Sequence, residues 1–277
     1  MADPKATPRR LVGHDYITPD LVAKVTGQAK YAEDYRAEGM LWAKLLLSPM
    51  PHARVTRIDA SAALAMPGVK ALLTVDDLPA VVEGANLGEG IIASSLSERG
   101  LTSEPLYEGE PILAIAAVDE LTAAEAIEKI VIDFEPLPFV VDPLEALRPG
   151  SPNAREQGNV WVRPAAPAPG QPPAGGPRVE ELKWTGDDFA AAADRQLPLG
   201  KATDEWSFGD VAAGLAQADL VLDETFVGPN TSHEPMETRS AMAYWQNGKL
   251  FMHCSTQSTM RTVGAVARWV GIEPKDV

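Results

Sequence analysis

The stretch PILAIAAVDELTAAEAIEKIVIDF, residues 111–134, decides the fold because it joins strand, helix and strand patterns with almost no loop between them. Residues 111–118 form an apolar run of strand length. Asp119 follows directly; aspartate favours the N-cap of a helix, and apolar residues recur behind it at helical spacing. Residues 130–134 are again rich in β-branched and aromatic side chains, which favour a strand. The stretch therefore predicts a mixed α+β domain.

The segments upstream of this stretch extend the same alternation. Residues 41–47 are a compact apolar run ended by Ser-Pro, which favours a largely buried strand. Residues 59–66 begin with an aspartate cap and stop at Pro-Gly, as a short helix does. Residues 69–75 return to a strand pattern, and residues 80–105, rich in glycine and serine, are predicted to form an irregular loop.

A proline-rich segment divides the chain. Residues 164–177 contain six prolines and three glycines, a composition that interrupts helices and sheet ladders and favours extended chain. The predicted organisation is a first domain at residues 10–150, a linker at 151–205 and a second unit at 206–277. Because a unit of about 70 residues is small for an independent core, the second unit is expected to pack against further protein.

The second unit is predicted to place a hairpin between two helices. Residues 211–218 read as a helix and residues 220–227 as a strand. Two further strands, at 241–245 and 250–253, are joined across an Asn-Gly step, which favours a tight turn. Residues 258–270 are predicted to form the last helix, with Ser258 or Thr259 as its cap and Gly271 directly after its end.

Composition excludes several classes of function. The 277 residues carry 24 Lys and Arg against 39 Asp and Glu, a net charge of -15, which argues against nucleic acid and anionic membranes as partners. One cysteine and four histidines cannot supply an iron–sulfur cluster or an all-protein metal cage. No apolar run reaches the roughly 18 residues of a membrane span, and no apolar leader follows the Arg-Arg pair near the N-terminus. A cytoplasmic protein is expected.

Two polar segments of the second unit are candidates for a functional site. The sequence HEPME, residues 233–237, begins like a zinc-protease helix, but Pro235 interrupts that helix and Glu237 replaces its second histidine. A zinc hydrolase is therefore rejected, and a polar turn between strands is the simpler interpretation. The sequence STQST, residues 255–259, crowds polar side chains where a strand ends and a helix begins. Helix N–H groups and the glutamine amide can donate jointly to an oxyanion or oxo ligand, and simple N-capping is the alternative.

Several phrases of the sequence together resemble one enzyme family. Residues 10–145 resemble the a/b hammerhead domain that opens the molybdopterin-binding large subunit of the xanthine dehydrogenase and aldehyde oxidoreductase family. The phrases are VTGQAKY at 25–31 with Asp34, LSP at 47–49, HAR at 52–54, ID at 58–59, MPGV at 66–69 and EGEP at 108–111. Residues 206–277 resemble the start of that subunit's molybdenum-cofactor domain, on His233 with Met236 and Glu237, and on STQSTMRT at 255–262. The implied fold is an a/b hammerhead domain followed by a partial mixed α/β molybdenum-cofactor-binding domain.

The resemblance implies that the chain is part of a molybdenum hydroxylase. Such an enzyme oxidatively hydroxylates an aldehyde or N-heterocycle with water as the oxygen source, and passes electrons to [2Fe–2S] and FAD on partner subunits. Gln257 matches the family glutamine whose amide contacts an oxo ligand of molybdenum, so it is predicted to bind the cofactor. The molybdenum-molybdopterin is then shared with the remaining molybdenum-subunit polypeptide, and a small-molecule substrate binds beside it.

The chain departs from the family pattern by what it lacks. It ends before the family's glycine-rich loop, the segments that grip the pterin and the glutamate that acts as base, so no catalytic residue or metal ligand is assigned. The enzyme is therefore expected to be incomplete without partner chains. The alternative is a non-catalytic scaffold module that docks an iron–sulfur subunit. Aldehydes, purines, nicotinate-like heterocycles and carbon monoxide all stay open as substrates.

Overall fold

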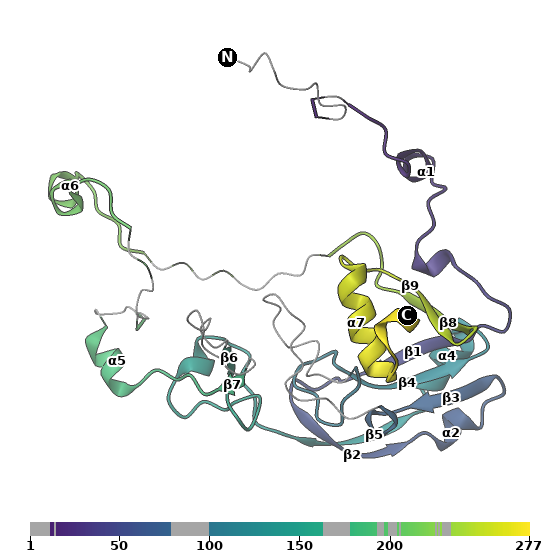
Figure 1. The fold of residues 1–277 in the computed structure, drawn as a ribbon. Helices are drawn as coiled ribbons and strands as arrows, with labels where there is room; N and C mark the ends of the chain where they lie inside the picture. Colours follow the sequence, from purple (N-terminus) through teal and green to yellow (C-terminus); the bar gives the residue numbers. More distant parts are fainter. Residues whose placement is uncertain are drawn as a thin grey trace. The chain divides into compact units, whose positions relative to one another are not determined.

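The structure is a computed structural model that describes residues 12–13, 15–78, 100–162, 178–192, 197–198, 204, 206–224, 226, 228 and 234–277. The chain divides into two compact units (Figure 1). We call Gly39–His233 the 39–233 unit, and Met1–Glu38 with Glu234–Val277 the two-segment unit. Most of the loop predicted at 80–105, and all of the proline-rich segment at 164–177, lie outside the described residues.

The 39–233 unit is built around a three-stranded antiparallel sheet with β4 (Pro111–Ala117) at its centre. β4 pairs with β1 (Trp42–Leu47) on one side and with β3 (Val69–Leu73) on the other. Neighbouring residues of a strand point to opposite faces, yet Ile112 and Leu113 are both at most 1% exposed. The sheet is therefore covered on both faces around its central strand, and the strands predicted for these three apolar runs are confirmed.

Helix α4 (Glu120–Ile127) begins directly after β4. The side chain of Asp119 accepts a hydrogen bond from the backbone N–H of Thr122 at 2.8 Å, which confirms Asp119 as the N-cap. A second helix, α2 (Ser61–Leu64), also contributes to the core. That core centres on three fully buried residues surrounded by partly buried ones: Ala63, Ile115 and Ala126, with Met66, Val69, Ile127 and Ile130.

The Asp119 cap makes the stability of this unit depend on pH. The hydrogen bonds from Thr122 lower the pKa of Asp119 below its ordinary value of 3.8. Because the folded pKa lies below the unfolded one, the stabilisation is complete above about pH 4 and is lost as the pH falls through the folded pKa. Asparagine also caps helices but does not titrate. We therefore expect the wild type to lose more stability below pH 4 than Asp119→Asn in urea titrations; parallel pH profiles would contradict this.

A second, two-stranded antiparallel sheet pairs β2 (Ala53–Asp59) with β5 (Val131–Pro136). The strand predicted at β5 is confirmed, whereas the sequence analysis predicts none at β2. The reason is that β2, with the sequence ARVTRID, carries three charged residues among seven and contains no apolar run. Arg57 Nε lies 2.7 Å from Asp133 Oδ2, and Arg54 pairs with the carboxylate of the facing Glu135.

The segment 151–205, predicted as a linker, contains regular structure. β6 (Val160–Val162) pairs with β7 (Arg178–Glu180), and α5 (Gly186–Ala191) is capped by Thr185. Helix α6 (Val211–Gln217) confirms the helix predicted at 211–218. The strand predicted at 220–227 is wrong for its described residues, which form neither helix nor strand. Its side chains are open to solvent, Leu220 at 74% and Leu222 at 70%, because no described strand pairs with them.

The two-segment unit is built on the predicted hairpin. β8 (Ala241–Gln246) and β9 (Lys249–Cys254) pair in antiparallel register. Asn247 and Gly248 have φ angles of 52° and 77°, the left-handed conformations that a tight two-residue hairpin turn requires. Helix α7 (Thr259–Val270) follows and ends at a glycine, as predicted.

The remaining helices are short. They are α1 (Leu21–Val25) and four 3-10 turns, η1 (Ala32–Asp34), η2 (Val75–Asp77), η3 (Glu145–Leu147) and η4 (Pro274–Asp276). Within the described ranges, every helix is too short or too polar to cross a membrane.

Candidate functional site at the start of helix α7

The polar segment predicted at residues 255–259 lies between the end of β9 and the start of α7. Ser258 Oγ accepts a hydrogen bond from the backbone N–H of Arg261 at 3.4 Å, and Thr256 Oγ1 accepts one from Ser258 N–H at 3.1 Å. Serine and threonine hydroxyls are typical acceptors for the free N–H groups of a first helical turn. Of the two caps predicted, Ser258 and Thr259, it is Ser258 that caps the helix, while Thr256 accepts the N–H of Ser258 itself.

Gln257 takes no part in this capping. Its side chain is exposed, and none of the residues that the structure describes hydrogen-bonds its amide. A glutamine amide offers two N–H donors and one carbonyl acceptor. It stands beside the N-terminal end of a helix of 12 residues, where the helix dipole favours electron-rich groups. The amide is thus available to donate to a ligand at this position.

Glu237 lies next to the same junction. Ser255 Oγ is 3.1 Å from Glu237 Oε1 and 2.9 Å from the backbone oxygen of Thr238. The backbone N–H of Ser255 donates to the carbonyl of Ser240 at 3.2 Å, which extends the hairpin ladder beyond β9. The segment that precedes β8 is therefore fastened to the residue that follows β9. His233, the first residue of the HEPME sequence, lies outside the described residues.

The described part of the HEPME segment, residues 234–237, shows no helix. Glu234 has a φ angle of 41°, a left-handed conformation that breaks regular structure before the proline. Across the part of the chain that the structure describes, no group of three His, Cys, Asp or Glu side chains could hold a metal ion.

The N-terminal segment packs on the hairpin through an aromatic stack. The rings of Tyr35 and His253 lie with centroids 3.8 Å apart and planes 15° from parallel, and Tyr244 continues the stack. Thr238 Oγ1 donates to Glu33 Oε2 at 2.9 Å. A groove of about 450 Å³ opens beside the stack. These contacts hold residues of η1 against β8 and β9, and so fix the hairpin whose end carries Gln257.

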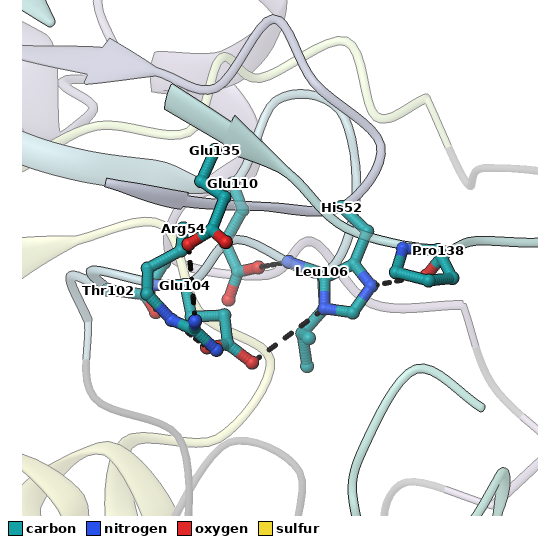
Figure 2. A network of polar contacts seen from close by, with 8 residues as sticks. All are labelled: His52, Arg54, Thr102, Glu104, Leu106, Glu110, Glu135 and Pro138. Atoms are coloured by element: carbon teal, nitrogen blue, oxygen red, sulfur yellow. Dashed lines mark hydrogen bonds and ion pairs between the residues drawn. The ribbon is translucent and has the colours of Figure 1, made fainter. Parts of the chain in front are cut away.

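A different network of polar contacts lies in the 39–233 unit, around His52 and Arg54 of the HAR phrase (Figure 2). His52 is 8% exposed, and its Nδ1 lies 2.7 Å from the carbonyl oxygen of Pro138, to which it donates. Its Nε2 is 3.7 Å from Glu104 Oε1. Arg54 reaches the other oxygen of Glu104 through Nε and Nη2, at 3.1 and 3.0 Å, and also contacts Glu135.

This network joins three segments of the chain, and we interpret its role as structural. Its ion pairs are exposed, and exposed ion pairs add little to stability. The buried His52 has a hydrogen-bond partner for its Nδ1 in the carbonyl of Pro138, whereas its Nε2 has none among the described residues. Sequence analysis did not predict the network, since Glu104 and Glu135 lie far along the chain from Arg54.

Glu110 is the buried carboxylate of this region and carries a prediction. It is 8% exposed, and its Oε2 accepts the backbone N–H of Leu106 at 2.6 Å. Glu110→Ala leaves that N–H without its acceptor, so we expect the 39–233 unit to lose about 1–3 kcal/mol in urea unfolding. Glu108→Ala, an exposed neighbour of the same residue type, is the matched control and should stay within about 0.5 kcal/mol. Equal losses in the two variants would contradict a structural role for Glu110.

Comparison with known proteins gives two family matches along the chain. Residues 26–138 match the family described as aldehyde oxidase and xanthine dehydrogenase, a/b hammerhead domain. Residues 194–277 match the molybdopterin cofactor-binding domain. The described strands and helices of mixed order agree with both, and the α+β fold class predicted from the sequence is confirmed. Gln257 lies within the second match.

Relatives are similar over much of this chain but over a minor part of their own length. The probable hypoxanthine oxidase XdhD of Escherichia coli strain K12 is 27% identical over 280 residues, 96% of this chain and 28% of that protein. The carbon monoxide dehydrogenase large chain of Afipia carboxidovorans is 36% identical over 131 residues, 47% of this chain and 16% of that protein. The chain therefore spans less than a third of the length of either relative.

A solved structure shows the same fold. Quinoline 2-oxidoreductase from Pseudomonas putida 86 matches with a TM-score of 0.65 at 22% identity, over 95% of this chain and 29% of that one. At a sequence identity this low, the match shows a shared fold and nothing about function. The path of the backbone through both matched regions is thus shared with a much longer polypeptide.

Proposed function

The chain belongs to the xanthine dehydrogenase and aldehyde oxidoreductase family, where it corresponds to part of the molybdopterin-binding large subunit, and we propose that it serves a molybdenum hydroxylase. The observation that carries the proposal is the exposed Gln257 amide beside the capped start of α7. It occurs inside the segment that matches the molybdopterin cofactor-binding domain. Gln257 is the residue that we assign to the cofactor.

The residues present fit such a group in their chemistry. Molybdopterin carries oxygen-rich and anionic groups, which hydrogen-bond donors and the positive end of a helix favour. Gln257 supplies a neutral donor whose amide no described side chain occupies. When bound, the molybdenum cofactor supplies two-electron oxidation of a carbon centre. The part that falls to this chain is to orient the cofactor and to donate hydrogen bonds to it.

The chain needs other protein to complete this site. Met236 stands next to Glu237 and is 102% exposed. Met260 lies at the start of α7 and is 80% exposed. Both side chains are apolar, and cover by another protein part would remove them from water. We assign that cover to the remainder of the large subunit, which also carries the base and the other cofactor contacts. Electrons pass from there to an iron–sulfur subunit with [2Fe–2S] and to an FAD subunit.

The substrate class follows from the family rather than from this site. The matched family is described for aldehyde oxidases and xanthine dehydrogenases, and one relative is named for hypoxanthine. We assign an aldehyde or an N-heterocycle as substrate, hydroxylated with oxygen from water. Turnover in ¹⁸O-labelled water tests this assignment: the label should enter the product, and unlabelled product would contradict it.

Metal analysis of the chain purified with its native partners tests the proposed function. We expect about one molybdenum per copy of the chain, together with iron from the partner. The competing role, a scaffold that docks an iron–sulfur subunit, predicts iron without molybdenum. A complex that contains this chain and iron, but whose molybdenum stays near zero, would therefore favour the scaffold and overturn the proposal.

A further inference from the structure

We infer that Ser255 and Thr256 are positioning residues that fix the backbone from which the Gln257 side chain projects, an assignment that rests on the proposed function. The two residues precede Gln257 directly, and both are tied through hydroxyl groups to other segments of the two-segment unit. The exposed amide therefore projects from a backbone that is fixed, although no described residue holds the amide itself.

Ser255 is held on the side of the hairpin. Its N–H donates to the carbonyl of Ser240, which gives the chain one more ladder bond after β9 ends. Its hydroxyl shares one hydrogen between the carbonyl of Thr238, at 2.9 Å, and the carboxylate of Glu237, at 3.1 Å. These three contacts reach back 15 to 18 residues, so they resist rotation of the backbone at Ser255.

Thr256 is held on the side of the helix by a closed chain of hydrogen bonds. Its Oγ1 accepts the N–H of Ser258 at 3.1 Å and lies 2.8 Å from Oγ1 of Thr262. The hydroxyl of Thr262 in turn donates to the carbonyl of Ser258 at 2.9 Å. The ring of contacts joins the residue before Gln257, the residue after it and the second turn of α7.

The consequence for Gln257 is restricted backbone motion on both sides. A single hydrogen-bond donor binds a ligand best when few conformations are open to it beforehand, because restricting the others on binding costs conformational entropy. The hydroxyl groups of Ser255 and Thr256 fix the backbone on one side of Gln257 and, through Ser258, on the other, and so limit the directions that the amide can take. Sequence reasoning identified the polar cluster but not this division of roles, which depends on contacts with residues 237–240.

Hydrogen exchange in the full chain tests the geometric part of the inference. Ser255→Ala and Thr256→Val each remove hydroxyl contacts, so backbone exchange at Ser255 and Ser258, whose N–H groups are hydrogen-bonded, should quicken about 5-fold. Ser255→Thr and Thr256→Ser restore a hydroxyl and should return exchange to the wild-type rate. Thr259→Val is the matched control, since Thr259 is exposed and its hydroxyl bonds to no described residue. Unchanged exchange in both loss variants would overturn the inference.

The EPR spectrum of the reduced, molybdenum-loaded complex tests the link to the cofactor. Ser255→Ala and Thr256→Val should shift the molybdenum signal in the same direction as Gln257→Ala, and the hydroxyl-restoring variants should not. If Gln257→Ala alone shifts the signal, the proposed function stands and the positioning role is overturned. If Gln257→Ala leaves both the signal and the molybdenum content unchanged, the proposed function fails, and the inference fails with it.

Discussion

Gln257→Ala is expected to lower kcat of the assembled oxidoreductase by about 10²–10³-fold, the usual cost of removing one preorganised hydrogen-bond donor from a site where charge develops. Gln257 is exposed, and no described residue bonds its amide, so the substitution removes nothing that holds the fold together. The melting temperature of the chain should therefore stay unchanged. Steady-state kinetics and thermal unfolding of the same preparation measure both quantities.

Gln246→Ala is the matched control for that experiment. Gln246 is also an exposed glutamine of the two-segment unit, and it lies on the hairpin at the end of β8. We expect its kcat to stay within about twofold of the wild type, since surface substitutions cost little. If Gln246→Ala and Gln257→Ala had the same kcat, Gln257 would have no special role in the reaction.

The second large effect concerns the core of the 39–233 unit. Ile115 is 0% exposed in the central strand β4 and belongs to the cluster with Ala63 and Ala126. Ile115→Ala removes buried methyl groups and leaves a cavity between sheet and helices, so we expect a loss of about 2–5 kcal/mol in unfolding free energy. Native-state hydrogen exchange of the β4 amides at rising urea concentrations measures that loss locally.

Leu121→Ala provides the comparison for Ile115→Ala. Leu121 lies in α4, is 69% exposed, and is replaced by a strong helix former. Its substitution should change the unfolding free energy by less than about 0.5 kcal/mol. A loss for Ile115→Ala no larger than that for Leu121→Ala would show that β4 is not the centre of a packed core.

The elements that the sequence predicts well are those whose signals are local. Residues 111–134 combine an unbroken apolar run with an aspartate cap, and the structure places β4, α4 and β5 there. The Asn-Gly turn between β8 and β9 is equally local, because only those residue types adopt the left-handed angles readily.

The elements that the sequence analysis misses depend on partners. β2 carries three charged residues among seven and no apolar run, and the pairing of Arg57 with Asp133 across the sheet exists only in the folded chain. The apolar residues at 220–224 have strand composition, but without a neighbouring strand in the described chain they form none. Composition therefore overestimates strands that lack a partner and overlooks strands whose partner neutralises their charge.

The candidate site shows the same division. The cap residues and the position of Gln257 between strand and helix follow from the sequence, whereas the assignment of Gln257 to a cofactor rests on family resemblance. The contact of Ser255 with Glu237 joins residues 18 positions apart, and no local pattern announces it. That contact fixes the backbone beside Gln257, and only the folded chain reveals it.

The most direct measurement is a structure of the chain in its complete molybdenum-loaded complex. The proposed function predicts that Nε2 of Gln257 lies within about 2.7–3.2 Å of an atom of the bound cofactor, the range of an N–H hydrogen bond. It also predicts that the amide, exposed in the chain alone, is covered there by other protein. A Gln257 amide that faces bulk water, with the cofactor beyond hydrogen-bond reach, would contradict the assignment.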